Sequence, residues 1–192
     1  MYSSDWRCAR HGGVLPLKRL HHLDEATLSH VRTRSEVPVW LPDPVPQGWG
    51  LSGLATVGDE RSRVRATVTS FRGPAPLGGD GEWLIVAEEP GIGLGASYAA
   101  SGEPELPTRD GAVPAAKLHA EGRPTSLWPV RTTVTDRSSY VGEAAGVWLW
   151  LISFPADAGY AVLEDLTLSD ARTAALELAA EHPSERIRPN PV

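Results

Sequence analysis

Cys8 and His11 are the two residues whose types and spacing point most directly to chemistry. Two residues separate them, and this spacing can place two ligands on one zinc ion around a tight turn. The two glycines that follow His11 would let the backbone pass close to the metal. A structural zinc ion needs four ligands, however, and the sequence has no second cysteine. The nearest additional candidates are His21, His22 and His30. Because their spacing is unusual for a zinc site, an unmetallated surface segment is the alternative interpretation.

A second candidate is the pair of carboxylates Glu88 and Glu89, which ends an apolar stretch and precedes Pro90. A carboxylate at a strand end can serve as a general acid or base. Adjacent strand residues point to opposite faces of a sheet, so the two glutamates cannot form an acid–base pair with each other. The candidate partners lie elsewhere in the sequence, at His119, Glu143, Asp157 and Glu164. Solvated acids and a hydrated His119 are the simpler interpretation, because charged side chains are seldom buried unpaired.

Residues 91–96 formally fit the G-x-G-x-x-A variant of a dinucleotide-binding motif, and Asp110 lies near the expected acidic position. The mechanism of that motif requires a helix whose N-terminus faces the pyrophosphate. Pro104 and Pro107 leave little room for such a helix, and no βαβ pattern follows. We therefore expect a turn-rich loop here and no nucleotide cofactor.

Trp40 and Trp49 lie in residues 37–49, a segment that its four prolines should hold extended and stiff. Packing in the core is the default role of a large aromatic side chain. A partly exposed pair of tryptophans would instead line a groove or dock a partner. Together with residues 73–98, which are rich in glycine and proline, this segment is predicted to shape a binding surface. Its candidate residues are Trp40, Trp49, Glu88, Glu89 and Tyr98.

The elements that must position these residues are predicted to be mainly strands. Apolar patterns predict strands at residues 51–57, 64–69, 82–89, 147–154 and 160–166, with one or two more within 117–130. In the second of these, polar residues such as Thr67 and Thr69 alternate with apolar ones, which is typical of a half-buried strand. The run 147–154 is apolar on both faces, which predicts a central strand.

Helical patterns are fewer. They predict a short helix at residues 23–33, a helical turn within 136–145 and a C-terminal helix that begins at Ser169 and ends near residue 182. This order of elements predicts an α+β fold with a mainly antiparallel sheet, a short N-terminal helix and a C-terminal helix. The predicted organisation is an irregular head at 1–22, a short helix and junction at 23–36, a single α+β domain at 37–183 and a frayed tail at 184–192.

Several longer motifs follow one another along the chain. They are W-x-C-x-x-H-G at residues 6–12, V-P-V-W-L-P-x-P-x-P-x-G-W at 37–49, P-L-G-G at 76–79, V-A-E-E at 86–89, G-x-G-L-G-A-x-Y at 91–98, G-E-A-A at 142–145 and W-L-W at 148–150. In this order they resemble an uncharacterised bacterial family known from GC-rich genomes, over nearly the whole chain. That family has no established activity.

The resemblance has a consequence for the head. It implies that residues 1–22 are the second half of a zinc ribbon whose first half is an upstream Cys-x-x-Cys. No cysteine precedes Cys8 in this sequence. We therefore expect that this chain has lost the metal site or that its start codon was assigned too late. We expect bound zinc only if ligands upstream of Met1 exist.

Charge and composition disfavour several classes of function. The net charge is −6, and only the first 36 residues are mildly basic, with six basic and four acidic residues, so the acidic remainder lacks the surface of a nucleic-acid binder. The longest apolar run, residues 147–154, is far shorter than the roughly 20 residues of a membrane-spanning helix. The first 20 residues show no signal-peptide pattern, and the single cysteine suits a reducing compartment, so we expect a cytoplasmic protein.

The leading hypothesis is a non-enzymatic cytoplasmic binding or protein-interaction module with no catalytic residue. Its partner would be a protein or a small ligand, and neither nucleic acid nor a membrane is expected. One alternative is an enzyme that uses Glu88 or Glu89 as a strand-end carboxylate. The other alternative is a zinc-ribbon adaptor that uses Cys8 and His11.

Overall fold

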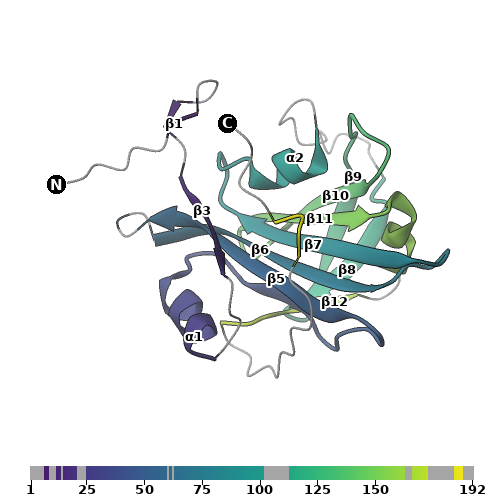
Figure 1. Ribbon diagram of the computed structural model, residues 1–192, viewed down its shortest axis with the longest axis horizontal. Coiled ribbons are helices and arrows are strands. Elements are labelled where there is room, and N and C mark those ends of the chain that lie inside the picture. Colours follow the sequence, from purple (N-terminus) through teal and green to yellow (C-terminus); the bar gives the residue numbers. More distant parts are fainter. Residues whose placement is uncertain are drawn as a thin grey trace.

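A mixed sheet of ten strands forms most of the described structure (Figure 1). The computed structural model describes residues 7–8, 12–13, 15–20, 25–59, 61, 63–101, 113–162, 166–172 and 184–187. Within these residues the strands of the sheet are β3 (Leu17–Leu20), β4 (Trp40–Pro42), β5 (Gly50–Asp59), β6 (Arg63–Pro74), β7 (Asp80–Glu88), β8 (Ala116–Ala120), β9 (Arg123–Pro129), β10 (Ser138–Ala144), β11 (Val147–Phe154) and β12 (Thr167–Asp170). The other described elements are the helices α1 (Glu25–Arg34) and α2 (Leu94–Ala99), the 3-10 helix η1 (Ala156–Val162), and a separate pair of short strands, β1 (Arg7–Cys8) and β2 (Gly12–Gly13).

Strand pairing in the sheet is antiparallel except between β8 and β12. The order across the sheet is β3-β5-β6-β7-β11-β10-β9-β8-β12-β4. The prediction of a mainly antiparallel sheet is therefore confirmed, and β11, the strand predicted to be central, lies between β7 and β10. No helix among the described residues is long and apolar enough to cross a membrane.

The sheet curls, so that its last strand, β4, lies across the face of β6. The hydroxyl of Thr67 donates to the carbonyl oxygen of Pro38 over 2.6 Å, and the hydroxyl of Thr69 donates to that of Trp40 over 2.8 Å. Both threonines are buried. The expectation of a half-buried β6 is therefore wrong, because residues 37–42, here named the crossing segment, cover its polar side chains.

Both faces of the sheet are apolar, and each contributes to a separate core. Because side chains alternate along a strand, β11 gives Leu149 and Leu151 to an inner cluster inside the curl, and Trp150 and Ile152 to an outer cluster. The crossing segment fills the inner cluster. The outer cluster is covered by α2 and by residues 184–187, which cross the same face of the sheet as a short yellow segment in Figure 1.

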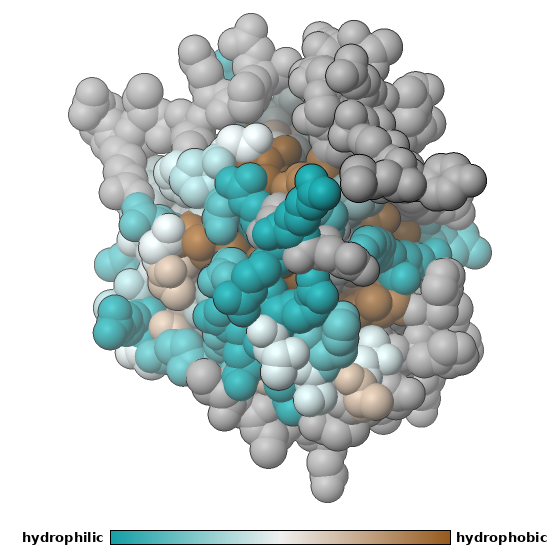
Figure 2. Space-filling view, turned by 90° about the vertical axis from the view of Figure 1, so that its left-hand side faces the viewer, coloured by the Kyte–Doolittle hydropathy of each residue, from teal (hydrophilic) through white to brown (hydrophobic). Residues whose placement is uncertain are grey.

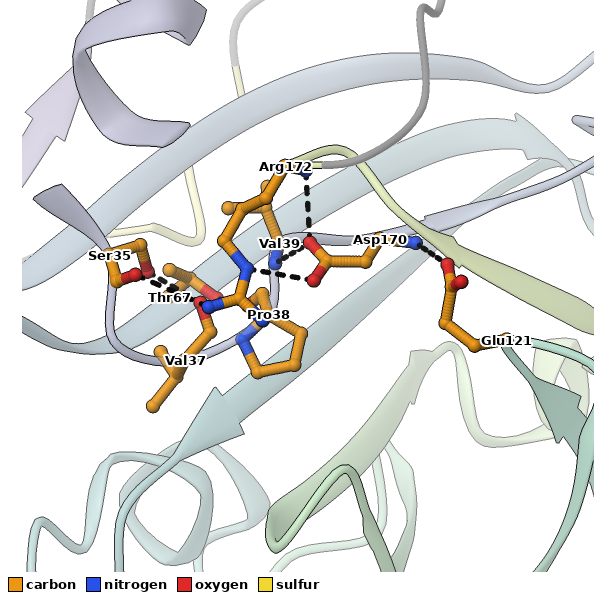
Figure 3. Close-up of polar contacts among 8 residues, drawn as sticks. All are labelled: Ser35, Val37, Pro38, Val39, Thr67, Glu121, Asp170 and Arg172. Atoms are coloured by element: carbon orange, nitrogen blue, oxygen red, sulfur yellow. Dashed lines mark hydrogen bonds and ion pairs between the residues drawn. The ribbon is translucent and has the colours of Figure 1, made fainter. Parts of the chain in front are cut away.

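A polar clasp fixes the crossing segment to the end of β12 (Figure 3). The buried carboxylate of Asp170 accepts hydrogen bonds from the backbone N–H groups of Val39 and Arg172, each over 3.0 Å. The Arg172 side chain pairs with the same carboxylate at 2.7 Å and donates to the carbonyl oxygen of Ser35 at 3.2 Å. The backbone N–H of Asp170 donates to the carboxylate of Glu121 over 2.6 Å. The clasp thus satisfies a buried carboxylate, which would otherwise be costly.

Two predicted elements take another form. The helical turn expected within residues 136–145 is wrong, because these residues form β10. Gly142 allows this strand to lie close to β9, since a Cβ on Gly142 would come within 2.4 Å of the carbonyl oxygen of Ser126. The return strand expected at 160–166 is wrong at its start, where η1 continues to Val162, and residues 163–165 lie outside the described residues.

The helices match the sequence prediction only in part. α1 lies where the short N-terminal helix was expected; its described residues begin at Glu25, and residues 23 and 24 lie outside the described residues. The C-terminal helix does not begin at Ser169, because Ser169 lies in β12 and pairs with Leu41 of β4. The remainder of that helix falls on residues 173–183, which lie outside the described residues. α2 was not expected from the sequence.

Candidate functional site

Two segments that were predicted to shape a binding surface lie beside each other at one end of the inner cluster. They are the β4–β5 loop, residues 43–49, and the tip of the β6–β7 hairpin, residues 74–80, and we name them together the loop pair. A Cβ added to Gly48 would lie 3.3 Å from the Cδ atom of Pro74, so the two loops are in direct contact. The fold therefore joins two regions that are separate in the sequence.

Trp49 fixes the loop pair to the sheet. Its ring stacks on the ring of Trp83, with the centroids 3.6 Å apart and an angle of 17° between the planes. The same indole lies over Gly73 and Gly81, which pair across β6 and β7, and a Cβ on Gly73 would come within 2.4 Å of it. The two glycines therefore leave the space that the indole fills, an arrangement in which an aromatic ring compensates for glycine in a sheet.

The hairpin tip holds an apolar side chain in solvent. Leu77 is 81% exposed. Backbone hydrogen bonds of 3.0 Å, from Ala75 to the carbonyl oxygen of Gly79 and from Gly78 to that of Ala75, close the turn around it. Gly78 and Gly79 have φ values of +96° and +81°, which glycine adopts without strain. Among the described residues, the other exposed large apolar side chains are Val113 and Val134.

Trp40 does not contribute to this surface. It is 1% exposed and belongs to the inner cluster. The expectation of a partly exposed Trp40/Trp49 pair is therefore wrong for Trp40, because the crossing segment runs inside the curl of the sheet. Of residues 37–49, only the part from 43 onward reaches the surface.

Glu88 ends β7 on the outer face and is 2% exposed. Its carboxylate accepts hydrogen bonds from the backbone N–H groups of Leu94 at 2.6 Å and Gly95 at 3.3 Å. These groups begin α2, so Glu88 takes the place that a phosphate would need at this helix start. Gly95 lets the helix lie directly on Trp150, because a Cβ there would come within 2.2 Å of the indole. In this chain the G-x-G-x-x-A motif therefore positions a helix that is capped by the protein's own carboxylate.

Burial is the largest influence on the pKa values of Glu88 and Tyr98. It raises the pKa of Glu88 above its ordinary value, and the hydrogen bonds from Leu94 and Gly95 offset only part of that effect. Burial also raises the pKa of Tyr98, more than the charge of Arg19 lowers it. The Tyr98 hydroxyl is buried and has no hydrogen-bond partner among the described residues. Glu88 and Tyr98 therefore hold α2 on the sheet rather than facing solvent.

The carboxylates do not form an acid–base pair. Glu89 pairs with Arg65 at 2.6 Å and is partly exposed. Glu143 lies in the same cross-strand row as Glu88, with Trp148 of β11 between them. Since neighbouring strands are about 4.8 Å apart, the backbones of the two acids are roughly 10 Å apart.

The other candidate partners of the carboxylates lie elsewhere. His119 occupies an exposed position of β8, as does Lys117. β8 is not a neighbour of β7 in the sheet. Asp157 lies in η1, and Glu164 lies outside the described residues. The structure therefore does not bring His119 or Asp157 to Glu88 or Glu89 through strand pairing.

The head of the chain forms a small hairpin at Cys8. Cys8 ends β1 and pairs with Gly12 of β2, so the described strands are antiparallel on either side of the Cys-x-x-His spacing. His11 lies outside the described residues. Within the described part of the chain, no group of three or more histidine, cysteine, aspartate or glutamate side chains is placed to hold a metal ion.

Sequence reasoning missed the most polar cluster of the outer face, which surrounds Glu82. Glu82 begins the apolar part of β7 and is 4% exposed. Its Oε1 atom accepts hydrogen bonds from the hydroxyls of Ser70, at 2.5 Å, and Ser184. Its Oε2 atom faces Arg72 at 3.7 Å and Arg186 at 3.4 Å. No local pattern signals this cluster, because its members come from segments that meet only in the folded chain.

A different face of the molecule, the one that carries β3 and α1, is mainly polar. Figure 2 shows hydrophilic residues over the centre of this face, with apolar patches that are separated from one another. An apolar docking surface is therefore better sought at the loop pair than on this face.

The comparisons with known proteins agree with the series of motifs that runs along the chain. No curated protein and no solved structure shows significant similarity to it. The model of one family, described as a family of unknown function, DUF6758, matches residues 1–187, which is nearly the whole chain. The chain therefore belongs to the DUF6758 family.

Proposed function

We propose that this chain is a cytoplasmic binding module that contacts a partner protein through the loop pair, with Leu77 as its apolar anchor. The observation that carries the proposal is the 81% exposure of Leu77 on a closed turn. A leucine held in solvent costs free energy, and a partner that covers it recovers that cost. Its rigid support favours binding, because little conformational freedom is lost when the partner docks.

The loop pair has the layout of a small interface. Trp49 stacks on Trp83 beneath it and is itself partly buried, so the surface rests on the inner core. The two loops contain prolines at positions 44, 46, 74 and 76, which limit the motion of both loops. Glu88 is less suited to a role as a general acid or base, since both oxygens of its carboxylate are bonded to the start of α2.

The proposal is tested by placing a photoreactive amino acid at position 77 of the full chain in its own host cell. We expect one discrete cross-linked adduct, identified by mass spectrometry. The purified partner should then bind the Leu77→Asp variant at least tenfold more weakly than wild type, since an interface anchor contributes about 2 kcal/mol or more.

Val113 provides the matched control, because it is 83% exposed and lies outside the loop pair. The photoreactive group at position 113 should give no adduct with the same partner, and Val113→Asp should bind it as wild type does. If neither position yields an adduct, or both yield the same one, the loop pair is not the contact surface.

We also propose, as a second candidate, that the head is a zinc-binding adaptor. The observation that favours it is the antiparallel pairing of β1 with β2, in which Cys8 lies opposite Gly12. Two further ligands are needed for a structural zinc ion. Elemental analysis of the purified chain checks this candidate. One zinc per chain that is lost in Cys8→Ser would support it, and a zinc-free wild-type chain would remove it for residues 1–192.

A further inference from the structure

Residues 184–187 lie on the outer face of the sheet in the manner of a bound peptide. The backbone N–H of Ser184 donates to the carbonyl oxygen of Ser52 over 2.6 Å, and the Ser184 carbonyl oxygen accepts from the guanidinium of Arg19. The backbone of Ser184 is therefore held by a carbonyl oxygen of β5 and by a side chain of β3.

The side chain of Ser184 enters a buried polar position. Its hydroxyl donates to Oε1 of Glu82, and the hydroxyl of Ser70 donates to the same oxygen at 2.5 Å. Ser52 and Ser70 are joined by a hydrogen bond of 2.8 Å. Ser184 and Ser70 are each 0% exposed. Because a buried acceptor left without donors is costly, this position favours a residue that can donate a hydrogen bond.

Arg186 lies on a surface that selects a cation. Its Nε atom is 3.4 Å from Oε2 of Glu82, and its guanidinium carbon is 4.0 Å from the centre of the Phe154 ring. A buried carboxylate beside an aromatic face attracts a guanidinium through both charge and the ring quadrupole. Since the side chain of Arg186 is still 44% exposed, this contact can form and break without opening the core.

Ile187 fills an apolar position. It is 0% exposed and belongs to the outer cluster. Gly53 makes the room for it, because a Cβ on Gly53 would come within 2.8 Å of Cδ1 of Ile187. Glu185, between the two anchors, is exposed. The outer face therefore holds a hydroxyl at position 184, an arginine at position 186 and an aliphatic side chain at position 187.

We propose that this docking strip, formed by Ser52, Gly53, Ser70, Glu82 and Phe154, is a peptide-binding site that residues 184–187 occupy in cis. Its partner is a segment of another protein that carries a serine, an arginine and an aliphatic residue in the positions of Ser184, Arg186 and Ile187. The charge of Glu82, which Arg72 also faces, favours the arginine, and the space at Gly53 favours the aliphatic side chain. The chain's own segment competes with the partner for the site. The partner displaces it only when the partner's concentration outweighs the effective concentration of the chain's own segment.

The strip is distinct from the loop pair, because it lies on the outer face of the sheet whereas Trp49 packs against the inner cluster. The proposal does not depend on the proposed function. If the Leu77 experiment fails, the proposal for the docking strip still stands. If the peptide experiment fails, the proposal for the loop pair still stands.

The experiment uses the full chain and a fluorescent synthetic peptide with the sequence of residues 182–190, HPSERIRPN. Ile187→Asp removes the apolar anchor in cis and should free the strip. We expect this variant to bind the peptide, measured by fluorescence anisotropy, at least tenfold more tightly than wild type. This factor follows from a site that the cis segment occupies nine-tenths of the time or more.

Two controls define specificity. A peptide with aspartate in place of its isoleucine should not bind the Ile187→Asp chain. Adding Glu82→Gln to that chain should weaken binding of the unaltered peptide at least tenfold, because the arginine loses its carboxylate. Equal binding of both peptides, or no binding of either, would overturn the proposal.

Folding and self-association are checked on the same samples. If Ile187→Asp unfolds, the double variant Ser184→Ala with Arg186→Ala replaces it, because it weakens the polar anchors and keeps Ile187 in the core. If that variant also unfolds, residues 184–187 are a fixed part of the core and the proposal is wrong. A wild-type dimer that the free peptide dissociates would assign the strip to a second copy of the chain, and would likewise overturn the proposed partner.

Discussion

At the scale of single residues, two buried glutamates organise the outer face. Glu82 and Glu88 lie on the same face of β7, about 20 Å apart if the strand is extended. Each one binds the backbone or side chains of a different covering segment, Glu82 through Ser184 and Arg186, and Glu88 through the start of α2. Buried carboxylates are stable only with such partners. The two covers of the outer cluster are thus attached to opposite ends of one strand.

Glu88 makes the stability of the protein depend on pH in a way that can be measured. Burial raises its pKa in the folded chain, so the folded state binds the proton of Glu88 more tightly than the unfolded state does. Its contribution to stability is therefore fully present below the unfolded pKa and is lost as the pH rises through the folded pKa. Relative to Glu88→Gln, the free energy of unfolding of wild type should increase as the pH falls from 7 toward 4.5. Urea unfolding followed by tryptophan fluorescence at several pH values checks this.

Glu143→Gln is the matched control for that series, because Glu143 is an exposed glutamate in the same cross-strand row. It removes one carboxylate from the same row and so controls for the change in net charge. If the difference between wild type and Glu88→Gln instead decreases as the pH falls, the hydrogen bonds from α2 outweigh the effect of burial.

At the scale of elements, the crossing segment and the β4–β5 loop form one continuous stretch with two different roles. The prolines were predicted to keep residues 37–49 extended, and the segment does cross β6 without forming a helix. Its burial could not be predicted, because it depends on a curl that brings β4 back to Thr67 and Thr69. Trp40 and Trp49 look alike in the sequence, yet one is core and the other supports a surface.

The two tryptophans should therefore differ in their effect on stability. Trp40→Ala removes a side chain that is 1% exposed and should lower the free energy of unfolding by about 3–5 kcal/mol. Trp49→Ala removes a partly buried ring and one aromatic stack, and should cost about 2 kcal/mol. Chemical denaturation of both variants measures the difference.

Leu77→Ala is the control for this comparison, and it should change stability by less than about 0.5 kcal/mol because Leu77 is mostly exposed. Equal losses for the two tryptophans would show that Trp49 is as much a part of the core as Trp40. In that case the loop pair could not change its conformation without disrupting the packing of the inner cluster.

At the scale of the whole molecule, local patterns predicted the strands better than their arrangement. The apolar run at 147–154 was enough to place β11 at the centre of the sheet, since a strand that is apolar on both faces must be covered on both. The six residues of α2 were missed because the helix depends on Glu88 and on Gly95 against Trp150 rather than on its own periodicity. The cluster at Glu82 was missed because Ser70 and Ser184 lie far apart in the sequence. Of the candidate binding residues, the sequence indicated the two loops and Trp49 but not the anchor Leu77.

The pairing of β4 with β12 has a consequence for how the chain is made. Leu41 lies opposite Ser169, so the apolar crossing segment emerges from the ribosome long before its partner strand exists. At about 5–20 residues per second, that interval lasts roughly 6–25 s. During it, the newly made chain presents an unpaired apolar strand edge, which is the kind of surface that chaperones cover. The completed protein closes that edge only when its last described strand arrives.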